Sequence, residues 1–313
     1  MGSLNEFLQI ARPILEIDYF IMLVFSLFIF VGLFNEKMRL FWEKTLNKNP
    51  EKILLLTFTF SAINLFHVLM RDIPLQNWLA YTLFLLIPTV CLLLANKKSQ
   101  KIQITDVIVI LFLWLPFDLR IIQESWFKFN YLFLSVSAAS VAIIGFSFVR
   151  NLKGLKINTE IKLKDILFSL KVLLVLIITI VPIGFILNFL EFGFKINLLN
   201  VNNILYLFVI LVLYFLQTGL PEEILFRGLL QNLLFKTWNS NWKAVIVASV
   251  MFGSAHLDNI ASGYGPPNWP YAILATIAGI GYGITYLKTK SIIIPGMLHA
   301  CVDLLWGLFF VKV

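Results

Sequence analysis

Two adjacent carboxylates and a guanidinium interrupt a long apolar stretch: Glu222 and Glu223 follow Pro221, and Arg227 lies four residues after Glu223. A charged residue inside a membrane span costs about 2.5–3.5 kcal/mol on insertion scales and is a functional hypothesis by default. On an α-helix, Glu223 and Arg227 share a face and can form an ion pair, whereas Glu222 points about 100° away. We therefore expect Arg227 to neutralise Glu223 and leave Glu222 free to act as a general base.

Pro221 predicts where the helix that carries these groups begins. Proline is favoured in the first helical turn, where its missing N–H is not needed. The helix dipole also favours negative charge in that turn, which suits Glu222 and Glu223. The structural alternative is a carboxylate pair at the membrane surface, with Arg227 reaching up to the interface.

Two of the three histidines of the chain lie in later apolar stretches. His256 ends a segment rich in small residues, which permit close helix approach, and Phe252 can pack on its ring from one turn earlier. His299 and Asp303 are four residues apart, so the carboxylate can accept from one imidazole nitrogen and fix the tautomer. Taken singly, each histidine could be a packed polar residue. Together with the glutamates and Arg227, they form the parts of a site that activates water and stabilises an oxyanion.

The segments that must position these residues are transmembrane helices. Of 313 residues, 59% are hydrophobic and only 13% are charged, whereas soluble domains carry about 25% charged residues. The apolar residues form blocks of the length that crosses a bilayer as helix, without the alternation of an outer-membrane barrel. We predict an all-α, polytopic transmembrane bundle with roughly eight to eleven spans around a polar intramembrane cavity. The candidate stretches are 17–35, 53–70, 77–95, 105–118, 127–149, 165–190, 202–220, 222–235, 243–257, 271–287 and 291–311.

The formal net charge of +8 comes largely from basic gaps between the apolar blocks, near 36–52, 96–104 and 150–164. Such gaps are typical of cytoplasmic loops and of contact with anionic lipid, so we expect a bilayer partner and no nucleic acid. The less basic gaps near 71–76, 118–126 and 191–201 are expected outside, together with the N-terminus. Placing Lys288 inside as well requires an odd number of crossings between 202 and 287, and we expect a broken or re-entrant segment near Pro221.

The polar, basic loop at 150–164 is the best internal boundary. We therefore divide the chain into N-terminal transmembrane helices of unknown role, residues 1–155, and a catalytic transmembrane core, residues 156–313. The expected location is the cell membrane, as a multi-pass protein.

Three motifs follow in order on successive apolar stretches: Glu222-Glu223-x-x-x-Arg227, Phe252-x-x-x-His256 and His299-x-x-x-Asp303. In this order, and with Ile294-Pro295-Gly296 before the last motif, they resemble the signature of the CPBP family of intramembrane proteases. This family is named for CAAX proteases and bacteriocin processing and is also called Abi. The resemblance covers about residues 165–313.

The resemblance implies an endopeptidase that cleaves peptide bonds near the membrane face, as type II CAAX prenyl endopeptidases do. Its substrate would be a peptide or protein at the membrane, lipid-modified where the host prenylates proteins. By the same resemblance, Glu222 would activate water with help from His256, and Glu223 with Arg227 would hold that base in place. His299 and Asp303 would stabilise the oxyanion.

Several alternatives remain open from the sequence. The family has been described both as metalloproteases and as metal-independent glutamate proteases. We expect no cofactor, with zinc as the alternative, because a catalytic zinc takes three protein ligands and a water and no His-Glu-x-x-His helix is present. A non-proteolytic membrane scaffold, immunity or regulatory factor is the second function considered. A proton-coupled transporter is the third function considered. The clustering of the polar residues at one site, rather than along a path through the membrane, argues against it.

Overall fold

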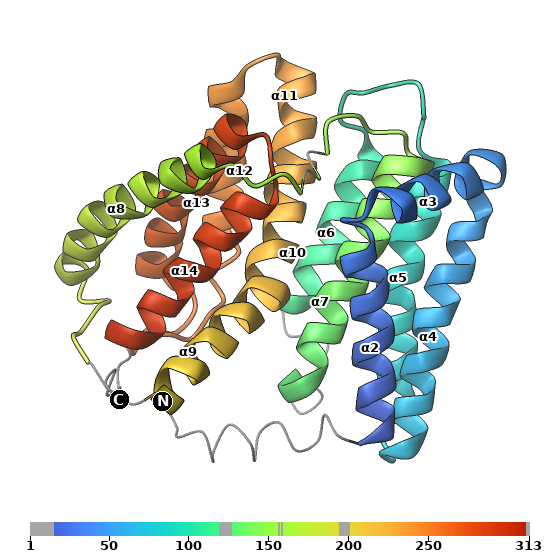
Figure 1. The fold of residues 1–313 in the computed structure, drawn as a ribbon, viewed down its shortest axis with the longest axis horizontal. Coiled ribbons are helices and arrows are strands. Elements are labelled where there is room, and N and C mark those ends of the chain that lie inside the picture. The colour runs from blue at the N-terminus through green and yellow to red at the C-terminus, as the bar shows by residue number, and fades with distance from the viewer. Residues whose placement is uncertain (1–15, 119–126, 156, 158, 194–200, 311–313) are drawn as a thin grey trace. The chain divides into compact units, whose positions relative to one another are not determined.

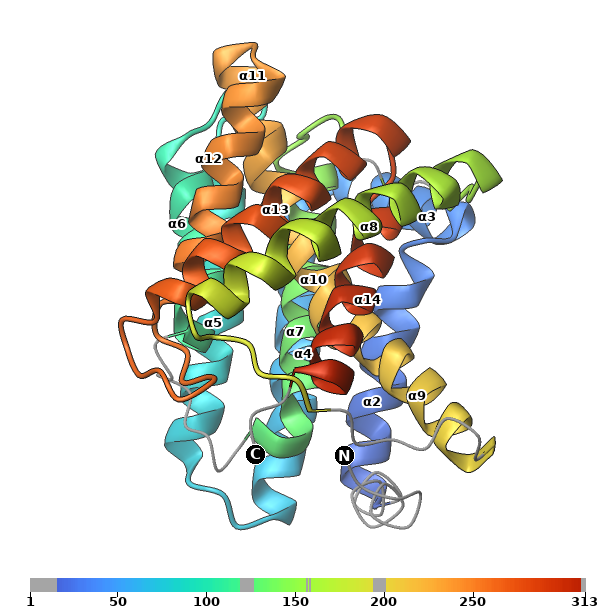
Figure 2. The same cartoon turned by 90° about the vertical axis from the view of Figure 1, so that its left-hand side faces the viewer.

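The computed structural model describes residues 16–118, 127–155, 157, 159–193 and 201–310. The chain divides into two compact units. One consists mainly of residues 12–155 together with 232–237, and the other of residues 156–231 and 238–313. The predicted outer gaps near 118–126 and 191–201 lie largely outside the described residues. Figures 1 and 2 show the helices of both units.

The N-terminal unit is built from long apolar helices joined by short polar loops. Its helices are α2 (Ile17–Gly32), α3 (Glu36–Lys48), α4 (Ile53–Met70), α5 (Leu75–Leu94), α6 (Ile104–Asp118) and α7 (Phe127–Ile144). A π-helical turn, Gly145–Val149, extends α7. Neighbours along the chain pack together, as α4 does with α5 and α5 with α6, and α2 packs on α7. Between α2 and α3 the chain bends by 90°.

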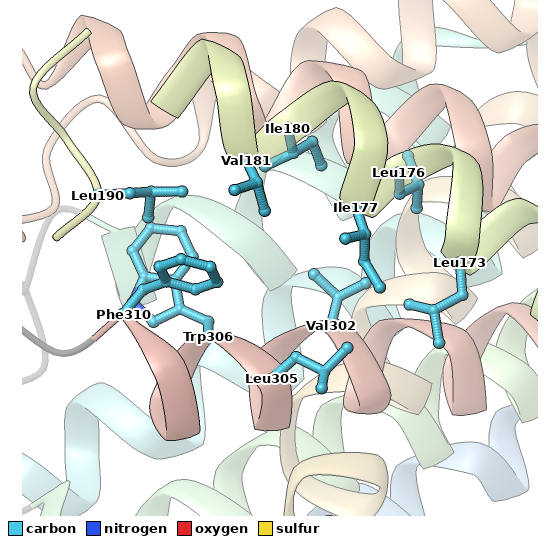
Figure 3. Close-up of a pocket in the computed structure, with 10 residues that line it drawn as sticks. All are labelled: Leu173, Leu176, Ile177, Ile180, Val181, Leu190, Val302, Leu305, Trp306 and Phe310. Atoms are coloured by element: carbon cyan, nitrogen blue, oxygen red, sulfur yellow. The ribbon is translucent and has the colours of Figure 1, made fainter. Parts of the chain in front are cut away.

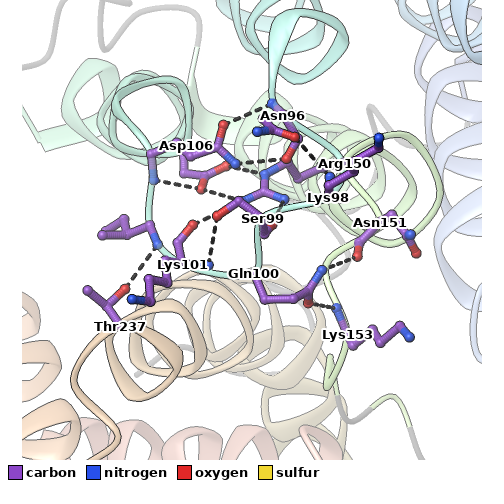
Figure 4. A network of polar contacts seen from close by, with 12 residues as sticks. Asn96, Lys98, Ser99, Gln100, Lys101, Asp106, Arg150, Asn151, Lys153 and Thr237 are labelled. Atoms are coloured by element: carbon purple, nitrogen blue, oxygen red, sulfur yellow. Dashed lines mark hydrogen bonds and ion pairs between the residues drawn. The ribbon is translucent and has the colours of Figure 1, made fainter.

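A buried ion pair closes one end of this unit (Figure 4). The guanidinium of Arg150 donates from Nε to Asp106 at 3.0 Å and from Nη2 to the other carboxylate oxygen at 3.1 Å. Both side chains are fully buried. Arg150 also donates to the backbone carbonyls of Ser99 and Lys101, and Thr237 accepts from the backbone N–H of Ile102. The pair therefore ties the 96–103 loop to the segment after α7.

Replacing Asp106 by alanine should destabilise the N-terminal unit strongly. The change leaves the guanidinium of Arg150 buried without its counter-charge, which costs about 3–5 kcal/mol of unfolding free energy. Thermal unfolding of the purified protein in detergent measures this loss as a lower midpoint. Glu51→Ala removes an exposed carboxylate from the same unit and should change stability by no more than about 0.5 kcal/mol. Equal midpoints for the two variants would contradict a structural role for the pair.

The C-terminal unit contains three long helices after the helical segment that carries Glu222 and Glu223. Its elements are α8 (Leu163–Ile186), α9 (Val201–Tyr214), α10 (Leu220–Glu223), α12 (Asn241–Ser254), α13 (Trp269–Thr289) and α14 (Ile293–Phe309). The side chain of Ser240 caps the start of α12, and that of Asn268 accepts from the backbone N–H of Tyr271 at the start of α13. Figure 2 shows α8 lying along α13, with α14 beside it, and these pairs are in contact.

The glutamates lie on one continuous helical run rather than at a helix start. α9 passes through a π-helix at Phe215–Gly219, α10 and a second π-helix at Ile224–Gln231 into α11 (Asn232–Trp238). The predictions of a helix that begins at Pro221 and of a broken or re-entrant segment there are therefore wrong. π-Helical hydrogen bonds run from i to i+5, so the backbone continues past the proline despite its missing N–H. The two expected stretches on either side of Pro221 therefore merge into one helical run, Ile204–Trp238.

Glycines bring the helices of this unit into close contact. A Cβ on Gly219 would lie 2.6 Å from the backbone oxygen of Gly296, so the glutamate run and α14 cross there. Gly219 precedes Glu222 by three residues, and Gly296 precedes His299 by three. The crossing therefore places the first and third motifs within about one helical turn of each other.

The helices confirm an all-α transmembrane bundle. Among the described residues, six helices are long and apolar enough to cross a membrane, or seven if the bent pair α2 and α3 is one span. The helical run 204–238 is one of the six, and α14 and residues 104–116 are shorter apolar helices. The number of spans, roughly eight to eleven, stays a prediction.

A small apolar cavity of about 50 Å³ lies between α8 and α14 (Figure 3). Its wall includes Val302, the residue before Asp303. Its lining residues are Leu173, Leu176, Ile177, Ile180, Val181, Leu190, Val302, Leu305, Trp306 and Phe310. Because this cavity is apolar, it is not the polar cavity expected around the carboxylates, which stays a prediction.

Candidate active site

The expected ion pair between Glu223 and Arg227 is present. Arg227 donates from Nη1 to Oε1 of Glu223 at 2.9 Å, and both side chains are fully buried. Its Nη2 donates to the backbone carbonyl of Gly279 on α13 at 3.0 Å. The guanidinium carbon lies 4.5 Å from the ring centre of Phe252 and 5.3 Å from that of Tyr282. Arg227 thus joins the glutamate helix to α12 and α13.

Glu222 and Glu223 have different surroundings, as their directions on the helix predict. The side chain of Glu222 is 26% exposed, whereas that of Glu223 is fully buried against Arg227. In the described residues, no arginine or lysine forms an ion pair with Glu222. Of these two carboxylates, Glu222 is therefore the more accessible.

His299 lies among three carboxylates. Its Nδ1 is 3.2 Å from Oε1 of Glu223, a hydrogen bond that the imidazole donates. Its Nε2 lies 3.9 Å from Oε2 of Glu222 and 3.7 Å from Oδ2 of Asp303. These two distances exceed a direct hydrogen bond and suit a bridging water or a substrate atom.

The carboxylate that orients His299 is therefore Glu223. The expectation that Asp303 accepts from the imidazole and fixes its tautomer is wrong, because 3.7 Å is too long for a hydrogen bond. Asp303 instead faces the same ring nitrogen as Glu222. Spacing along α14 suggested the local partner, whereas the crossing at Gly219 and Gly296 brings Glu223 closer.

His256 joins the group through Phe252. Its Nδ1 lies 2.9 Å from the backbone carbonyl of Phe252, and because a carbonyl only accepts, this nitrogen carries the proton. The ring of Phe252 meets His256 edge-on at 5.0 Å, as predicted, and also meets His299 at 5.5 Å. In the part of the chain that the structure describes, no hydrogen bond or ion pair joins His256 to Glu222.

Two aromatic residues that the sequence analysis did not single out border the histidines. Tyr282 stacks on His299, with ring centres 4.7 Å apart and planes at 22°. Tyr271 meets His256 at 4.5 Å. Neither tyrosine belongs to one of the three motifs, and no short sequence signal marked either of them.

The donor atoms do not form an evident metal site. No group of three or more His, Cys, Asp or Glu side chains within the described ranges is arranged to hold a metal ion. A catalytic zinc takes three protein ligands, and donation from Nδ1 leaves only Nε2 of each imidazole as a possible ligand. The donor set as arranged does not fit a catalytic zinc.

Comparison with known families matches residues 204–305 to the family described as type II CAAX prenyl endopeptidase, Rce1-like. Comparison with curated proteins and with solved structures finds no match. The matched range contains all six predicted site residues, Glu222, Glu223, Arg227, His256, His299 and Asp303. Over residues 204–305 this multi-pass helical membrane protein is similar to the Rce1-like type II CAAX prenyl endopeptidases, which is consistent with the CPBP family of intramembrane proteases that its motifs resemble.

Proposed function

We propose that the chain is a multi-pass endopeptidase of the cell membrane that hydrolyses peptide bonds with water activated by Glu222. One observation carries the proposal: Nε2 of His299 lies between the accessible carboxylates of Glu222 and Asp303, while Glu223 holds the other ring nitrogen. An exposed base beside a fixed donor is the arrangement that acyl transfer to water needs.

The first step is attack by water on the scissile carbonyl. Glu222 takes one proton from the water, and the oxygen of that water forms a bond to the carbonyl carbon. The carbonyl oxygen becomes an oxyanion. In its imidazolium form His299 donates Nε2–H to that oxygen, with Nδ1–H kept on Glu223. Asp303 lies beside the same nitrogen and offsets its charge.

The second step breaks the carbon–nitrogen bond. The oxyanion reforms the carbonyl as the leaving amine departs, and Glu222 returns its proton to that amine. The new carboxylic acid then gives its remaining proton to the amine, so the products are a carboxylate and an ammonium group, and Glu222 is ionised again. Since Nδ1 of His256 carries the proton, its Nε2 in the neutral ring is an acceptor, which suits holding the attacking water.

This mechanism needs no metal ion, so we expect cleavage to survive chelation. Activity after treatment with EDTA or 1,10-phenanthroline, followed by removal of the chelator, should equal that of untreated protein. Metal analysis of the same active preparation should find less than one zinc per chain. Loss of activity that added zinc restores would contradict the metal-free mechanism.

The substrate we propose is a membrane-bound protein ending in a prenylated cysteine and three further residues. Support comes from the family match, whose description names CAAX prenyl endopeptidases. Cleavage after the cysteine would release the last three residues. A peptide with farnesyl-cysteine near its C-terminus, a fluorophore before that cysteine and a quencher on the last residue reports this cut as a gain of fluorescence.

The test is cleavage of that peptide by the full chain in liposomes, with product masses determined. We expect release of a tripeptide, and slower cleavage of the same peptide without the farnesyl group. If the protein cleaves neither peptide, the proposed activity is overturned. A cellular phenotype that persists in Glu222→Gln, His256→Ala and His299→Ala variants would favour the scaffold function instead.

A further inference from the structure

His299 must keep one ring orientation for the proposed mechanism to work. The hydrogen bond from Nδ1 to Glu223 fixes one atom of the imidazole. Rotation about the Cβ–Cγ bond of His299 is opposed only by this one hydrogen bond, whose net strength is modest, and such a rotation would swing Nε2 away from Glu222 and Asp303. A second restraint is needed that acts on the plane of the ring.

Tyr282 supplies a restraint of this kind. Its ring lies nearly parallel to the imidazole of His299, with planes at 22° and centres 4.7 Å apart. Phe252 meets the same imidazole edge-on, at 86°. A stacked face and a perpendicular edge together block rotation of the imidazole in both directions.

Tyr282 is itself held rigidly. Its side chain is 1% exposed, and its ring meets that of Phe252 at 6.0 Å. The helix that carries it packs closely against the glutamate run, because a Cβ on Gly279 would lie 3.1 Å from Arg227 and one on Gly283 would lie 2.8 Å from Gln231. The carbonyls of these two glycines accept from the same two side chains. The helix therefore has little freedom to shift, and the ring is a fixed surface.

We propose that Tyr282 is a positioning residue that holds the imidazole of His299 in its working orientation through ring stacking. The inference rests on the proposed function and extends it to a residue outside the three motifs. Because the stack uses the ring face, the phenol oxygen is not required. Phenylalanine should therefore replace Tyr282, and an aliphatic side chain of similar volume should not.

The kinetic test compares Tyr282→Phe with Tyr282→Leu on the farnesylated peptide. We expect the leucine variant to keep its KM and to lose up to about 100-fold in kcat, the effect of misplacing a reacting group by about 1 Å. The phenylalanine variant should retain the kcat of the unmodified protein. Tyr81→Leu removes a buried, stacked tyrosine from the N-terminal unit and should leave kcat unchanged, which controls for a general loss of stability.

An independent readout comes from the imidazole signals. The chain has only three histidines, so protein labelled with ¹³C-histidine gives three sets of imidazole C–H signals, and His299→Gln identifies those of His299. Stacking on a ring face moves these signals upfield. We expect the shift to persist in Tyr282→Phe and to be lost in Tyr282→Leu.

The outcomes separate this inference from the proposed function. An upfield shift that is absent from the unmodified protein, or present in Tyr282→Leu, overturns the stack even if no peptide is cleaved. Equal losses of kcat in the phenylalanine and leucine variants also overturn it, since the hydroxyl would then be the active part. If the unmodified protein cleaves neither peptide, the proposed function fails, and the catalytic role of Tyr282 fails with it. If Tyr282→Leu does not fold, the same comparison with Tyr282→Met decides.

Discussion

Glu222→Gln should lower kcat/KM for the farnesylated peptide by about 10²–10⁴-fold, the contribution typical of a general base. Glutamine keeps the size of the side chain and one of its oxygens, but it cannot take a proton from water. Glu222 has 26% of its side chain exposed and forms no ion pair with Arg227. The change should therefore leave the fold and the melting midpoint nearly unaltered.

The same substitution at Glu51, an exposed glutamate of the N-terminal unit, is the matched control and should retain full activity. Initial rates in liposomes at equal protein content give both values. Activity of Glu222→Gln within about tenfold of the unmodified protein would mean that another group activates the water.

Gly253→Ala should strongly destabilise the C-terminal unit. A Cβ at this position would lie 1.9 Å from the hydroxyl of Thr276 and 2.4 Å from the backbone oxygen of Ala272. The hydroxyl can rotate away, but the backbone oxygen moves only if α12 separates from α13. Overpacking of this kind costs about 1–3 kcal/mol or more, and it would displace Phe252 and His256 together.

Thermal unfolding and peptide cleavage both measure this effect, and we expect the midpoint and the activity to fall together. Gly265→Ala is the matched control, because a Cβ on Gly265 would meet nothing within 4 Å. An unchanged midpoint for Gly253→Ala would show that α12 and α13 are not packed as closely as described.

The helices could largely be predicted from the sequence because each apolar block ends at polar or charged residues. The stretch expected at 53–70 is α4 to the residue, and that expected at 271–287 is α13 within two residues at each end. Long apolar blocks cannot form stable loops in a membrane, so hydropathy alone fixes their type. Ends are less certain because helix termini depend on caps, such as that of Asn268.

Pro221 shows where this reasoning fails. Proline normally marks a helix start or a break, and both expectations were drawn from it. The π-helical turn at Phe215–Gly219 lets the helix pass through. A π-turn shifts which side chains share a helix face, because its hydrogen bonds run from i to i+5. In a block that is apolar on all sides, the hydrophobic pattern does not reveal this shift.

The sequence predicts which residues could form the candidate site, but it predicts only some of the contacts among them. Glu223 and Arg227 are four apart on one helix, so the pair followed from spacing alone. The partner of His299 did not, because Glu223 is 76 residues away in the sequence and reaches the imidazole through the crossing of two helices. Tyr282 was missed for the same reason, since stacking between helices leaves no short motif.

Chemical rescue tests the central claim, that Glu222 rather than Glu223 is the base. Glu222→Ala and Glu223→Ala both lose a carboxylate, and formate is small enough to enter the space that either side chain leaves. The account predicts that formate restores peptide cleavage to Glu222→Ala in a concentration-dependent manner. Glu223→Ala should stay inactive, because formate cannot hold the imidazole of His299 and the guanidinium of Arg227 in place at once. Rescue of Glu223→Ala but not of Glu222→Ala would contradict the assignment of Glu222 as the base.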